Sequence, residues 1–407
     1  MERPYPQITV TEKAARALRG GHPWVFAGEV LTPGDPCADG ELVDVYTEKG
    51  RWQGVGFYNS HSQIRVRVLS RNTNDRMDEP FFARRIRYAL DYRRQVMGGD
   101  FAACRLIFGE ADGFPGWTVD RFGDVLVSEV LSLGIEQRKD MLYRRLRETL
   151  ADMGVTVRVI YERNESAIRE KEGMTCGKGA YTAAGLESDP SGHVEICENG
   201  LYFDVDYIHG QKTGYFLDQK YNRAAAARLA PGRKVLDCFT HTGAFALHCA
   251  ANRAESVTAV DVSADALTQA KANAGRNGLT DRVDFVQADV FAYLTALGEK
   301  KERPFDYIIL DPPAFTKSGA TVDSARRGYR EINRRAMQIL PRGGYLATCS
   351  CSHFMRDDLF RAMLSDAARD ASVSLRQIEA RQQSPDHPIL WGVPETDYLK
   401  FYLFQVV

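Results

Sequence analysis

The sequence has no apolar run long enough to cross a bilayer, and residues 1–4 lack the features of a secretory signal. Its eight cysteines are scattered along the chain and none forms a C-x-x-C pair, so neither a zinc ribbon nor a disulfide framework is indicated. Internal repeats and low-complexity tracts are also missing. These absences predict a cytoplasmic globular protein with free thiols, without a membrane segment and without a bound metal ion.

The sequence has little excess charge, because its 53 basic and 54 acidic residues nearly cancel to a net charge of −1. The basic residues are nevertheless unevenly placed, since arginines clearly outnumber acidic residues between positions 65 and 94. These arginines form either a solvated helix face with ion pairs or a patch that binds phosphate groups. The sequence leaves both interpretations open, and the candidates for phosphate binding are Arg84, Arg85 and Arg87.

The 407 residues exceed what one hydrophobic core usually holds, so two or three domains are expected. Short apolar runs separated by turns extend to about Arg71 and predict a small β-barrel. A helix over 79–97 and a mixed segment of strands and helices follow, up to about Pro190. A hairpin is predicted around Asn199-Gly200, because Asn-Gly readily supplies the positive φ angles of a type I′ turn.

From about Gly232 onward, apolar strand patterns alternate with helical patterns. Such alternation predicts an α/β domain with a largely parallel, doubly wound sheet. Ligands of such sheets bind at the carboxyl ends of the strands, near the point where the strand order reverses. The motifs described next all fall at these predicted strand ends.

The first strand of this region leads into the loop D-C-F-T-H-T-G at 237–243. This loop lacks the G-x-G-x-x-G spacing that holds the pyrophosphate of a dinucleotide. It instead resembles the D-x-F-x-x-T-G motif of class I S-adenosylmethionine-dependent methyltransferases, which holds the amino-acid end of the cofactor. The corresponding residues of this sequence are Asp237, Phe239, Thr242 and Gly243.

Two more aspartates end the next two predicted strands. Asp261 is well placed to accept hydrogen bonds from both ribose hydroxyls, and Asp289 can accept from an adenine amino group. A single aspartate at a strand end is more often a helix cap. Three of them at successive strand ends, after a glycine-containing loop, favour a site for S-adenosylmethionine instead.

Two further motifs end later strands: Asp-Pro-Pro-Ala-Phe at 311–315 and Ser-Cys-Ser at 350–352. The prolines have no N–H to donate, so nearby carbonyls stay free to accept hydrogen bonds. Asp311 can bond the edge of a nucleic-acid base, and Phe315 can stack on it or wall its pocket. Methyltransferases of exocyclic amines usually have the aromatic residue directly after the second proline, so Ala314 weakens that interpretation without excluding it.

Cys351 favours methyl transfer to a pyrimidine carbon. Carbon 5 of cytosine or uracil is a poor nucleophile, but a thiolate that adds to carbon 6 enables carbon 5 to attack a methyl sulfonium. The thiol must therefore lose its proton, although free cysteine has a pKa of about 8.5. The side chain of Cys349 points to the same side of the sheet as that of Cys351, but Cys349 lies nearer the middle of the strand, so we expect it in the core. A buried cysteine is ordinarily inert, and the neighbouring Asp-Pro-Pro motif is what makes Cys351 the candidate nucleophile.

Together these motifs resemble those of the bacterial large-subunit ribosomal RNA cytosine-5 methyltransferases that have an N-terminal PUA domain. The resemblance spans essentially the whole chain, and the combination of motifs is specific although no single motif is. It implies a PUA RNA-binding barrel over 1–75, a middle α+β domain over 76–190 and a Rossmann-like catalytic domain over 191–407. The matching segments are 22–26, 54–59, 212–219, 311–315, 327–329, 350–352 and 386–388.

The resemblance also implies the roles of individual residues. The single catalytic cysteine of the family corresponds to Cys351. The resemblance does not identify the group that takes the carbon-5 proton, and the candidates are Asp311 and a water molecule. The implied substrate is RNA, in particular large-subunit ribosomal RNA. A segment over 210–219 would cover the methionine part of the cofactor. The implied cofactor contacts are Thr213, Phe216, Asp218, Gln219 and Asp311, and the implied base pocket is formed by Pro312, Pro313 and Phe315.

Several points stay open from the sequence. Cys349 and Ala314 depart from the family pattern, Lys317 is placed near the base pocket, and His387 is read as a structural residue of a turn. Methylation of a ring or exocyclic nitrogen would use the same cofactor without needing Cys351. A non-catalytic RNA-binding assembly factor with a degenerate pocket is a third interpretation, and a homodimer is left open.

Overall fold

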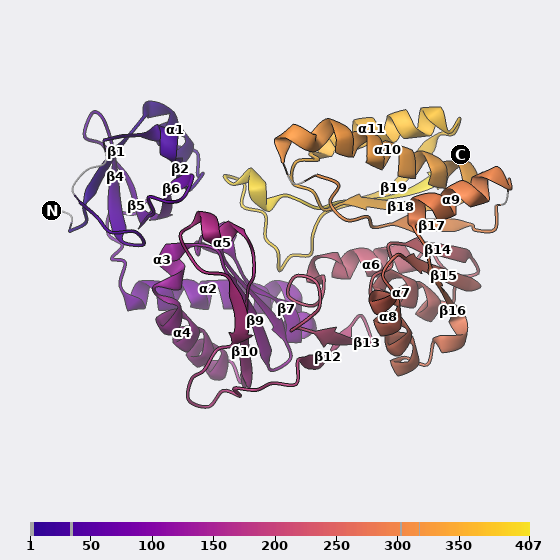
Figure 1. Cartoon of the computed structure of the whole chain (residues 1–407), viewed down its shortest axis with the longest axis horizontal. Coiled ribbons are helices and arrows are strands. Elements are labelled where there is room, and N and C mark those ends of the chain that lie inside the picture. Colours follow the sequence, from indigo (N-terminus) through magenta and orange to yellow (C-terminus); the bar gives the residue numbers. More distant parts are fainter. Residues whose placement is uncertain (1–3, 33–35, 302, 317) are drawn as a thin grey trace. The chain divides into compact units, whose positions relative to one another are not determined.

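The computed structural model describes residues 4–32, 36–301, 303–316 and 318–407 (Figure 1). Lys317, which the sequence placed near the base pocket, lies outside the described residues. In these ranges no helix combines the length and the apolar character that a bilayer span requires. The chain forms two compact units: the first comprises Met1–Ile196, Val205–Leu217 and Pro385–Thr396, and the second comprises Cys197–Asp204, Asp218–Ser384 and Asp397–Val407.

The N-terminal part of the first unit is a barrel-like sheet of six strands in the order β2-β6-β5-β4-β1-β3 (Figure 1). Inward-facing side chains such as Ile8, Val43 and Val66 form its core. Helix α1 is capped by Thr11, whose hydroxyl accepts a hydrogen bond from Ala14 N. The predicted barrel is confirmed. Its elements are β1 (Gln7–Val10), α1 (Glu12–Arg19), β2 (Trp24–Phe26), β3 (Val30–Thr32), β4 (Leu42–Thr47), β5 (Trp52–Tyr58) and β6 (Ile64–Ser70).

The rest of the first unit is built on a five-stranded sheet in the order β11-β10-β9-β8-β7. The long helix α2 begins at the predicted position because Asp78 caps it, accepting a hydrogen bond from Phe81 N at 3.1 Å. The expected mixture of strands and helices is therefore present. Its elements are α2 (Glu79–Met97), β7 (Ala103–Phe108), β8 (Trp117–Phe122), β9 (Val125–Val130), α3 (Leu133–Glu136), α4 (Lys139–Asp152), β10 (Val159–Asn164), α5 (Ile168–Lys171) and β11 (Gly177–Ala180).

A buried arginine fixes the segment Pro385–Thr396 within the first unit. Arg93 of α2 is fully buried and donates to both carboxylate oxygens of Asp112, at 2.5 and 2.8 Å. It also donates to the carbonyl oxygen of Asp386 at 3.0 Å, while Asp386 Oδ2 accepts from Arg105 N at 2.7 Å. His387 is buried beside Asp386, with its Nδ1 3.0 Å from Oδ1. The polar turn is thus used for packing in this unit from Pro385 onward.

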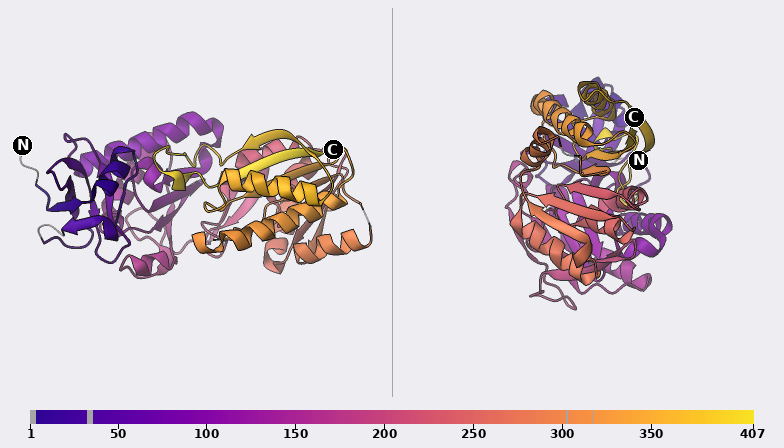
Figure 2. Two further views of the ribbon diagram at one scale, coloured as in Figure 1. Left: turned by 90° about the horizontal axis from the view of Figure 1, so that it is seen from above. Right: turned by 90° about the vertical axis from the view of Figure 1, so that its right-hand side faces the viewer.

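The second unit is a seven-stranded sheet in the order β16-β15-β14-β17-β18-β20-β19. Strands β14 to β18 run parallel, and β20 is inserted antiparallel beside β18. Helices α9, α10 and α11 cover one face, and α6, α7 and α8 lie on the other (Figures 1 and 2). This is the predicted doubly wound α/β fold, and its strand order reverses between β14 and β17.

These elements alternate between strand and helix as predicted, and two further strands follow the last helix. They are α6 (Lys220–Ala227), β14 (Lys234–Cys238), α7 (Ala244–Ala251), β15 (Ser256–Asp261), α8 (Ala264–Arg276), β16 (Val283–Gln287), α9 (Val290–Glu299), β17 (Tyr307–Leu310), α10 (Val322–Ile339), β18 (Tyr345–Ser350), α11 (Asp357–Asp370), β19 (Leu375–Arg381) and β20 (Lys400–Val406). A separate hairpin of β12 (His193–Glu198) and β13 (Leu201–Asp206) turns at Asn199 and Gly200, whose φ angles are +50° and +85°. The predicted Asn-Gly hairpin is confirmed.

Candidate active site

The loop between β14 and α7 has an unusual backbone. Phe239, His241 and Gly243 all have positive φ angles, of +63°, +51° and +85°. Positive φ is uncommon for residues other than glycine and tends to occur where a functional site holds the backbone in place. A Cβ atom at position 243 would lie 3.1 Å from the Cβ of Ala270, so glycine also allows the loop to approach α8 closely.

Asp237 lies buried at the start of this loop with one oxygen unused. Its Oδ2 accepts hydrogen bonds from Thr240 Oγ1 at 2.6 Å and from Ala246 N at 3.0 Å. Its Oδ1 is buried and has no hydrogen-bond partner among the described residues. Burial raises the pKa of this carboxyl to about 7. A buried acceptor without a hydrogen bond costs folding free energy. Such an acceptor fits a site in which a ligand amino group donates the missing hydrogen bond.

Asp261 and Asp289 stand at the carboxyl ends of β15 and β16, as predicted. Asp261 accepts from His241 N through Oδ2 and from Ser263 N through Oδ1, both at 2.9 Å. Asp289 is exposed and caps α9, because its Oδ1 accepts from Ala292 N at 2.8 Å. Each carboxylate oxygen can accept a second hydrogen bond, so these local bonds leave room for ribose or adenine donors.

The ends of β17 and β18 bring Asp311 and Cys349 together. Leu310 pairs with Thr348 in the parallel register, and Cys349 Sγ donates to Asp311 Oδ1 at 2.9 Å. Gln219 Nε2 also donates to Asp311 Oδ1, at 3.2 Å. Desolvation raises the pKa of the Asp311 carboxyl, and burial raises that of the Cys349 thiol well above its usual range. Cys349 is fully buried, as expected, but it belongs to this polar network.

Cys351 follows β18 and is only partly exposed. Burial, with the carboxylates of Asp311 and Asp218, raises the pKa of its thiol to about 12, while Lys400 acts in the opposite direction. Lys400 itself is 4% exposed and donates through Nζ to Ser352 O at 2.7 Å. The sequence analysis did not identify Lys400. The signal that could have found it is a lysine at the start of the otherwise largely apolar strand K-F-Y-L-F-Q-V.

The aromatic residue of the Asp-Pro-Pro motif packs toward the core. The ring centroid of Phe315 lies 4.5 Å from that of Tyr329, and 6.1 Å from that of Phe291. Pro312 is buried, whereas Pro313 is exposed. In this structure Phe315 therefore braces the motif against α10, and its contact with a base stays a prediction.

The residues predicted to cover the cofactor divide between the two units. Thr213 and Phe216 belong to the first unit, where the Thr213 hydroxyl donates to Asp120 Oδ2 at 2.6 Å. Asp218 and Gln219 belong to the second unit. Asp218 Oδ2 accepts from Tyr398 OH at 2.6 Å, and no hydrogen-bond partner for the buried Oδ1 is found in the described chain. Asp218 thus offers a second unused acceptor near the predicted site.

The sequence analysis also did not predict a buried ion pair between α6 and β12. Arg223 of α6 donates to both oxygens of Glu198, at 2.8 and 3.0 Å, and both residues are buried. His248 of α7 lies 3.7 Å from Glu198 and stacks on Phe203 at 5.7 Å between centroids. These residues lie far apart in the sequence and follow no motif, so only the fold brings them together.

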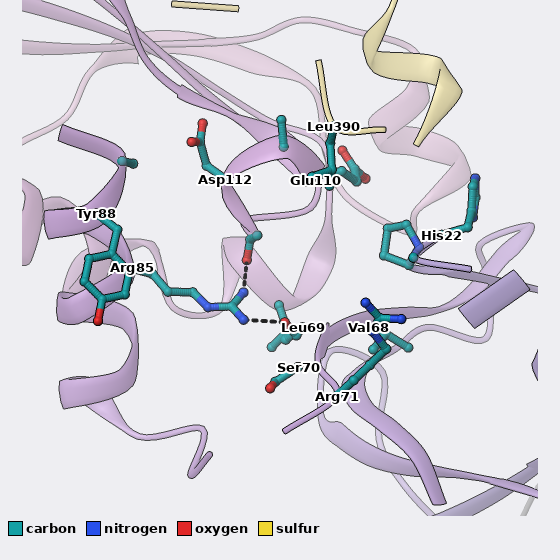
Figure 3. A pocket seen from close by; sticks show the side chains of 15 residues that line it. His22, Val68, Leu69, Ser70, Arg71, Arg85, Tyr88, Glu110, Asp112 and Leu390 are labelled. Carbon is teal, nitrogen blue, oxygen red and sulfur yellow. Dashed lines mark hydrogen bonds between the residues drawn. The ribbon is translucent and has the colours of Figure 1, made fainter. Parts of the chain in front are cut away.

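Of the arginine cluster, Arg85 is held inside the first unit. It donates to the carbonyl oxygens of Gly113 at 3.0 Å and Leu69 at 2.6 Å, at the edge of a pocket of about 360 Å³ (Figure 3). Burial lowers its pKa to about 10. Exposed Tyr88 of α2 also lines this pocket. Arg85 therefore joins α2 to strand β6 and to the turn at Gly113 rather than projecting freely into solvent.

The other two arginines lie nearer the surface and are ion-paired. Arg84 pairs with Asp75 at 3.2 Å, and Arg87 pairs with Asp152 at 2.9 Å. Such exposed pairs contribute about 0–1 kcal/mol, so a phosphate group could displace them at little cost. RNA binding by Arg84, Arg85 and Arg87 stays a prediction.

The described residues contain no group of three or more His, Cys, Asp or Glu side chains that could hold a metal ion, and the eight cysteines are free.

Comparisons with known proteins agree with this architecture. The model of an S-adenosylmethionine-dependent methyltransferase family matches residues 178–405, and that of a PUA-like domain matches residues 8–71. The chain is 36% identical over 405 residues to ribosomal RNA large subunit methyltransferase I of Klebsiella pneumoniae (strain 342), covering 99% of each chain. It is 42% identical over 396 residues to the protein of the same name from Shewanella denitrificans, covering 96% of this chain and 97% of the relative.

Solved structures show the same fold. A Streptococcus mutans protein, provisionally described as an S-adenosylmethionine-dependent methyltransferase, superposes with a TM-score of 0.82 at 21% identity. The match covers 98% of this chain and 100% of the other. A second structure, provisionally described as a methyltransferase and solved with S-adenosylhomocysteine, gives a TM-score of 0.83 with the same identity and coverage.

Proposed function

Because this chain belongs to the family of S-adenosylmethionine-dependent large-subunit ribosomal RNA methyltransferases with a PUA-like domain, we propose that it methylates carbon 5 of a cytidine through a covalent adduct with Cys351. S-adenosylmethionine supplies an electrophilic methyl group on a positively charged sulfur. The observation that supports the proposal most is the position of Cys351, directly after β18 and near Asp311 at the end of β17. A base in a duplex or stack would have to be flipped out to reach it.

Residues at the strand ends would hold the cofactor. The unused Oδ1 atoms of Asp237 and Asp218 are acceptors for donors that the protein itself does not supply. Asp261 and Asp289 keep acceptor capacity beyond their local bonds. The full proposed set, which is the one predicted from the sequence, is Thr213, Phe216, Asp218, Gln219, Asp237, Phe239, Thr242, Gly243, Asp261, Asp289 and Asp311.

The proposed reaction has three steps: addition of the thiolate, methyl transfer and elimination. Sγ of Cys351 gives its proton to solvent and the thiolate adds to carbon 6, which makes carbon 5 nucleophilic. Carbon 5 then attacks the methyl group, so the new carbon–carbon bond forms as the methyl–sulfur bond of the donor breaks. A base removes the carbon-5 proton, and the released electron pair restores the ring by breaking the bond between carbon 6 and Sγ. Cys351 is regenerated as a thiolate.

Asp311 is the proposed base for the carbon-5 proton. Desolvation raises its pKa, which makes its carboxylate a better proton acceptor than a solvated one. Gln219 and Cys349 both donate to its Oδ1, which fixes the orientation of the carboxylate. Pro312 and Pro313 follow directly and would form one wall of the base pocket, with Phe315 behind them.

The protonated state of Cys351 favours a second candidate, methylation of a ring or exocyclic nitrogen of an RNA base. With a pKa of about 12, this cysteine is a thiol at neutral pH in the free protein. Nitrogen methylation needs no thiolate, so this state would not hinder it. In that case Cys351→Ser would keep activity, whereas in the carbon-5 reaction it would lose it.

Covalent trapping separates the two candidates. RNA that contains 5-fluorocytidine should form a denaturant-resistant adduct with the protein in the presence of S-adenosylmethionine, because fluorine cannot leave as the proton does. We expect the adduct to be lost in Cys351→Ala and kept in Cys349→Ala, which is the matched control two residues away. An adduct that depends on Cys349, or methylation that survives in Cys351→Ser, would overturn the proposal.

A further inference from the structure

Lys400 is a buried cation at the edge of the candidate active site. It begins β20 and stands opposite Ser350, the last residue of β18, in the antiparallel register. Its Nζ donates to the carbonyl oxygens of Ser352 at 2.7 Å and Tyr398 at 2.8 Å. A buried ammonium group is costly unless such acceptors surround it, so the site maintains this charge against a penalty.

Lys400 is one of three groups that fix the turn containing Cys351. Ser350 Oγ donates to Tyr329 OH at 3.1 Å, and Ser352 Oγ donates to Thr316 O at 3.1 Å. The residues on both sides of Cys351 are therefore anchored. Lys400 binds the carbonyl oxygen of Ser352, the residue that directly follows Cys351. Because the backbone is fixed on both sides, the direction of the Cys351 side chain is restricted.

We propose that Lys400 is a positioning residue for Cys351. Lys400 holds the turn that presents the thiol, and its positive charge favours the thiolate. This inference rests on the proposed function of Cys351 as nucleophile. It explains how a thiol that is surrounded mainly by acidic groups could ionise during the reaction. A lysine that formed only a packing contact would not need to keep its charge.

The electrostatic surroundings of the two groups support this role. Burial and the carboxylates of Asp311 and Asp218 raise the pKa of Cys351, and Lys400 lowers it. Burial lowers the pKa of Lys400 to about 8, so Lys400 loses its charge within an accessible pH range. The other titratable or charged groups that act on Cys351 or Lys400, or lie on the same turn, are Tyr329, Cys349, His353, Asp357 and Asp397.

The rate at which iodoacetamide alkylates Cys351 in the full-length protein tests the proposal, since only the thiolate reacts. Peptide mass spectrometry would follow Cys351 in wild type, Lys400→Arg and Lys400→Met between pH 6.5 and 10. The exposed cysteines Cys176 and Cys197 serve as internal references. Their rates should be equal in all three proteins.

Below pH 8 we expect wild type to match Lys400→Arg, whereas Lys400→Met reacts about threefold to tenfold more slowly. As Lys400 loses its proton, the wild-type rate should rise less steeply and approach that of Lys400→Met above pH 9. Lys400→Arg stays charged and should keep its steep rise. A rate difference that is the same at every pH would show a purely structural role and overturn the proposal.

A folding defect in the variant and a failure of the proposed function can each be distinguished from a failure of the Lys400 proposal. If Lys400→Met fails to fold, the wild-type profile alone decides, because a profile without a flattening near pH 8 contradicts the proposal. The trapping reaction with 5-fluorocytidine is then run on the same proteins. Trapping on Cys351 with no effect of pH on the alkylation ratio rejects only the role of Lys400. The expected alkylation profile without trapping in any protein rejects only the proposed function.

Discussion

The Cys349 thiol and the Asp311 carboxylate form a 2.9 Å hydrogen bond that joins the ends of β18 and β17. The bond lies next to the proposed nucleophile and orients the proposed base, although Cys349 is not itself the proposed nucleophile. A strand-end cysteine can therefore serve the site without being the residue that attacks. This distinction leads directly to a test.

Cys349→Ala should lower the free energy of unfolding by about 1–3 kcal/mol more than Cys249→Ala, because it also removes a donor to Asp311. Cys249 is a suitable control since it is equally buried, in α7. Urea unfolding of both variants measures the difference. Equal losses would mean that the bond to Asp311 contributes nothing to stability.

Asp237→Asn should abolish binding of S-adenosylmethionine in calorimetry and change how stability depends on pH. The folded-state pKa of Asp237 is raised to about 7, so its carboxyl binds a proton more tightly in the folded protein than in the unfolded chain. Its contribution to the free energy of unfolding is therefore present at low pH and is lost as pH rises from about 4 to about 7.

Urea unfolding at pH 5 and pH 8 without cofactor checks the sign of this effect. Wild type should lose more stability between the two values than Asp237→Asn does. Asp284→Asn, at an exposed position on β16, controls for the loss of an acidic residue. If wild type and Asp237→Asn had the same pH dependence, the raised pKa would be wrong.

Glu198→Gln should destabilise the protein by about 3–5 kcal/mol, because it removes the buried carboxylate that accepts two hydrogen bonds from Arg223. Glu379→Gln removes a carboxylate from partly exposed pairs with Arg228 and Arg381 and should cost less than about 1 kcal/mol. Chemical denaturation compares the two. Similar costs would show that the buried pair does not depend on its charge.

The arginines of α2 should differ in their effects on RNA binding and on folding. Arg85→Met should cost about 1–3 kcal/mol of stability, because the carbonyls of Leu69 and Gly113 lose a charged donor. Arg84→Glu and Arg87→Glu should leave stability within about 1 kcal/mol and weaken RNA binding.

Filter binding at several salt concentrations, with unfolding measured in parallel, would distinguish these effects. Loss of a phosphate contact reduces the salt dependence of binding by about one unit of slope per contact. Unchanged affinity in Arg84→Glu and Arg87→Glu at low salt would exclude this helix face as an RNA contact.

Much of the fold follows from local patterns in the sequence. Alternating strand and helix periods predict the parallel sheet, and Asn199-Gly200 predicts its hairpin because two adjacent positive φ angles suit few other residue pairs. The strand pattern also predicts that the aspartates at the ends of β14, β15 and β16 lie near one another, since strand ends in a parallel sheet lie on one edge.

The parts that could not be predicted depend on contacts between distant segments. Lys400 comes 49 positions after Cys351 and reaches its turn only because β20 pairs with β18. Arg85 lies among exposed arginines in the sequence, and only the packing of Leu69 and Gly113 around α2 shows that its donors point inward. Charge counts along a helix cannot separate such a residue from its solvated neighbours.

The chain passes between the two units five times, at 196/197, 204/205, 217/218, 384/385 and 396/397. No single cut in the gene could therefore yield both units as complete pieces. A truncation before residue 385 would remove β20 along with the last segment of the first unit, and the methyltransferase sheet would lose an interior strand. Recombination at 204/205, 217/218 or 384/385 would break both units at once, and recombination at 196/197 or 396/397 would break one of them, so we expect the two units to be inherited together.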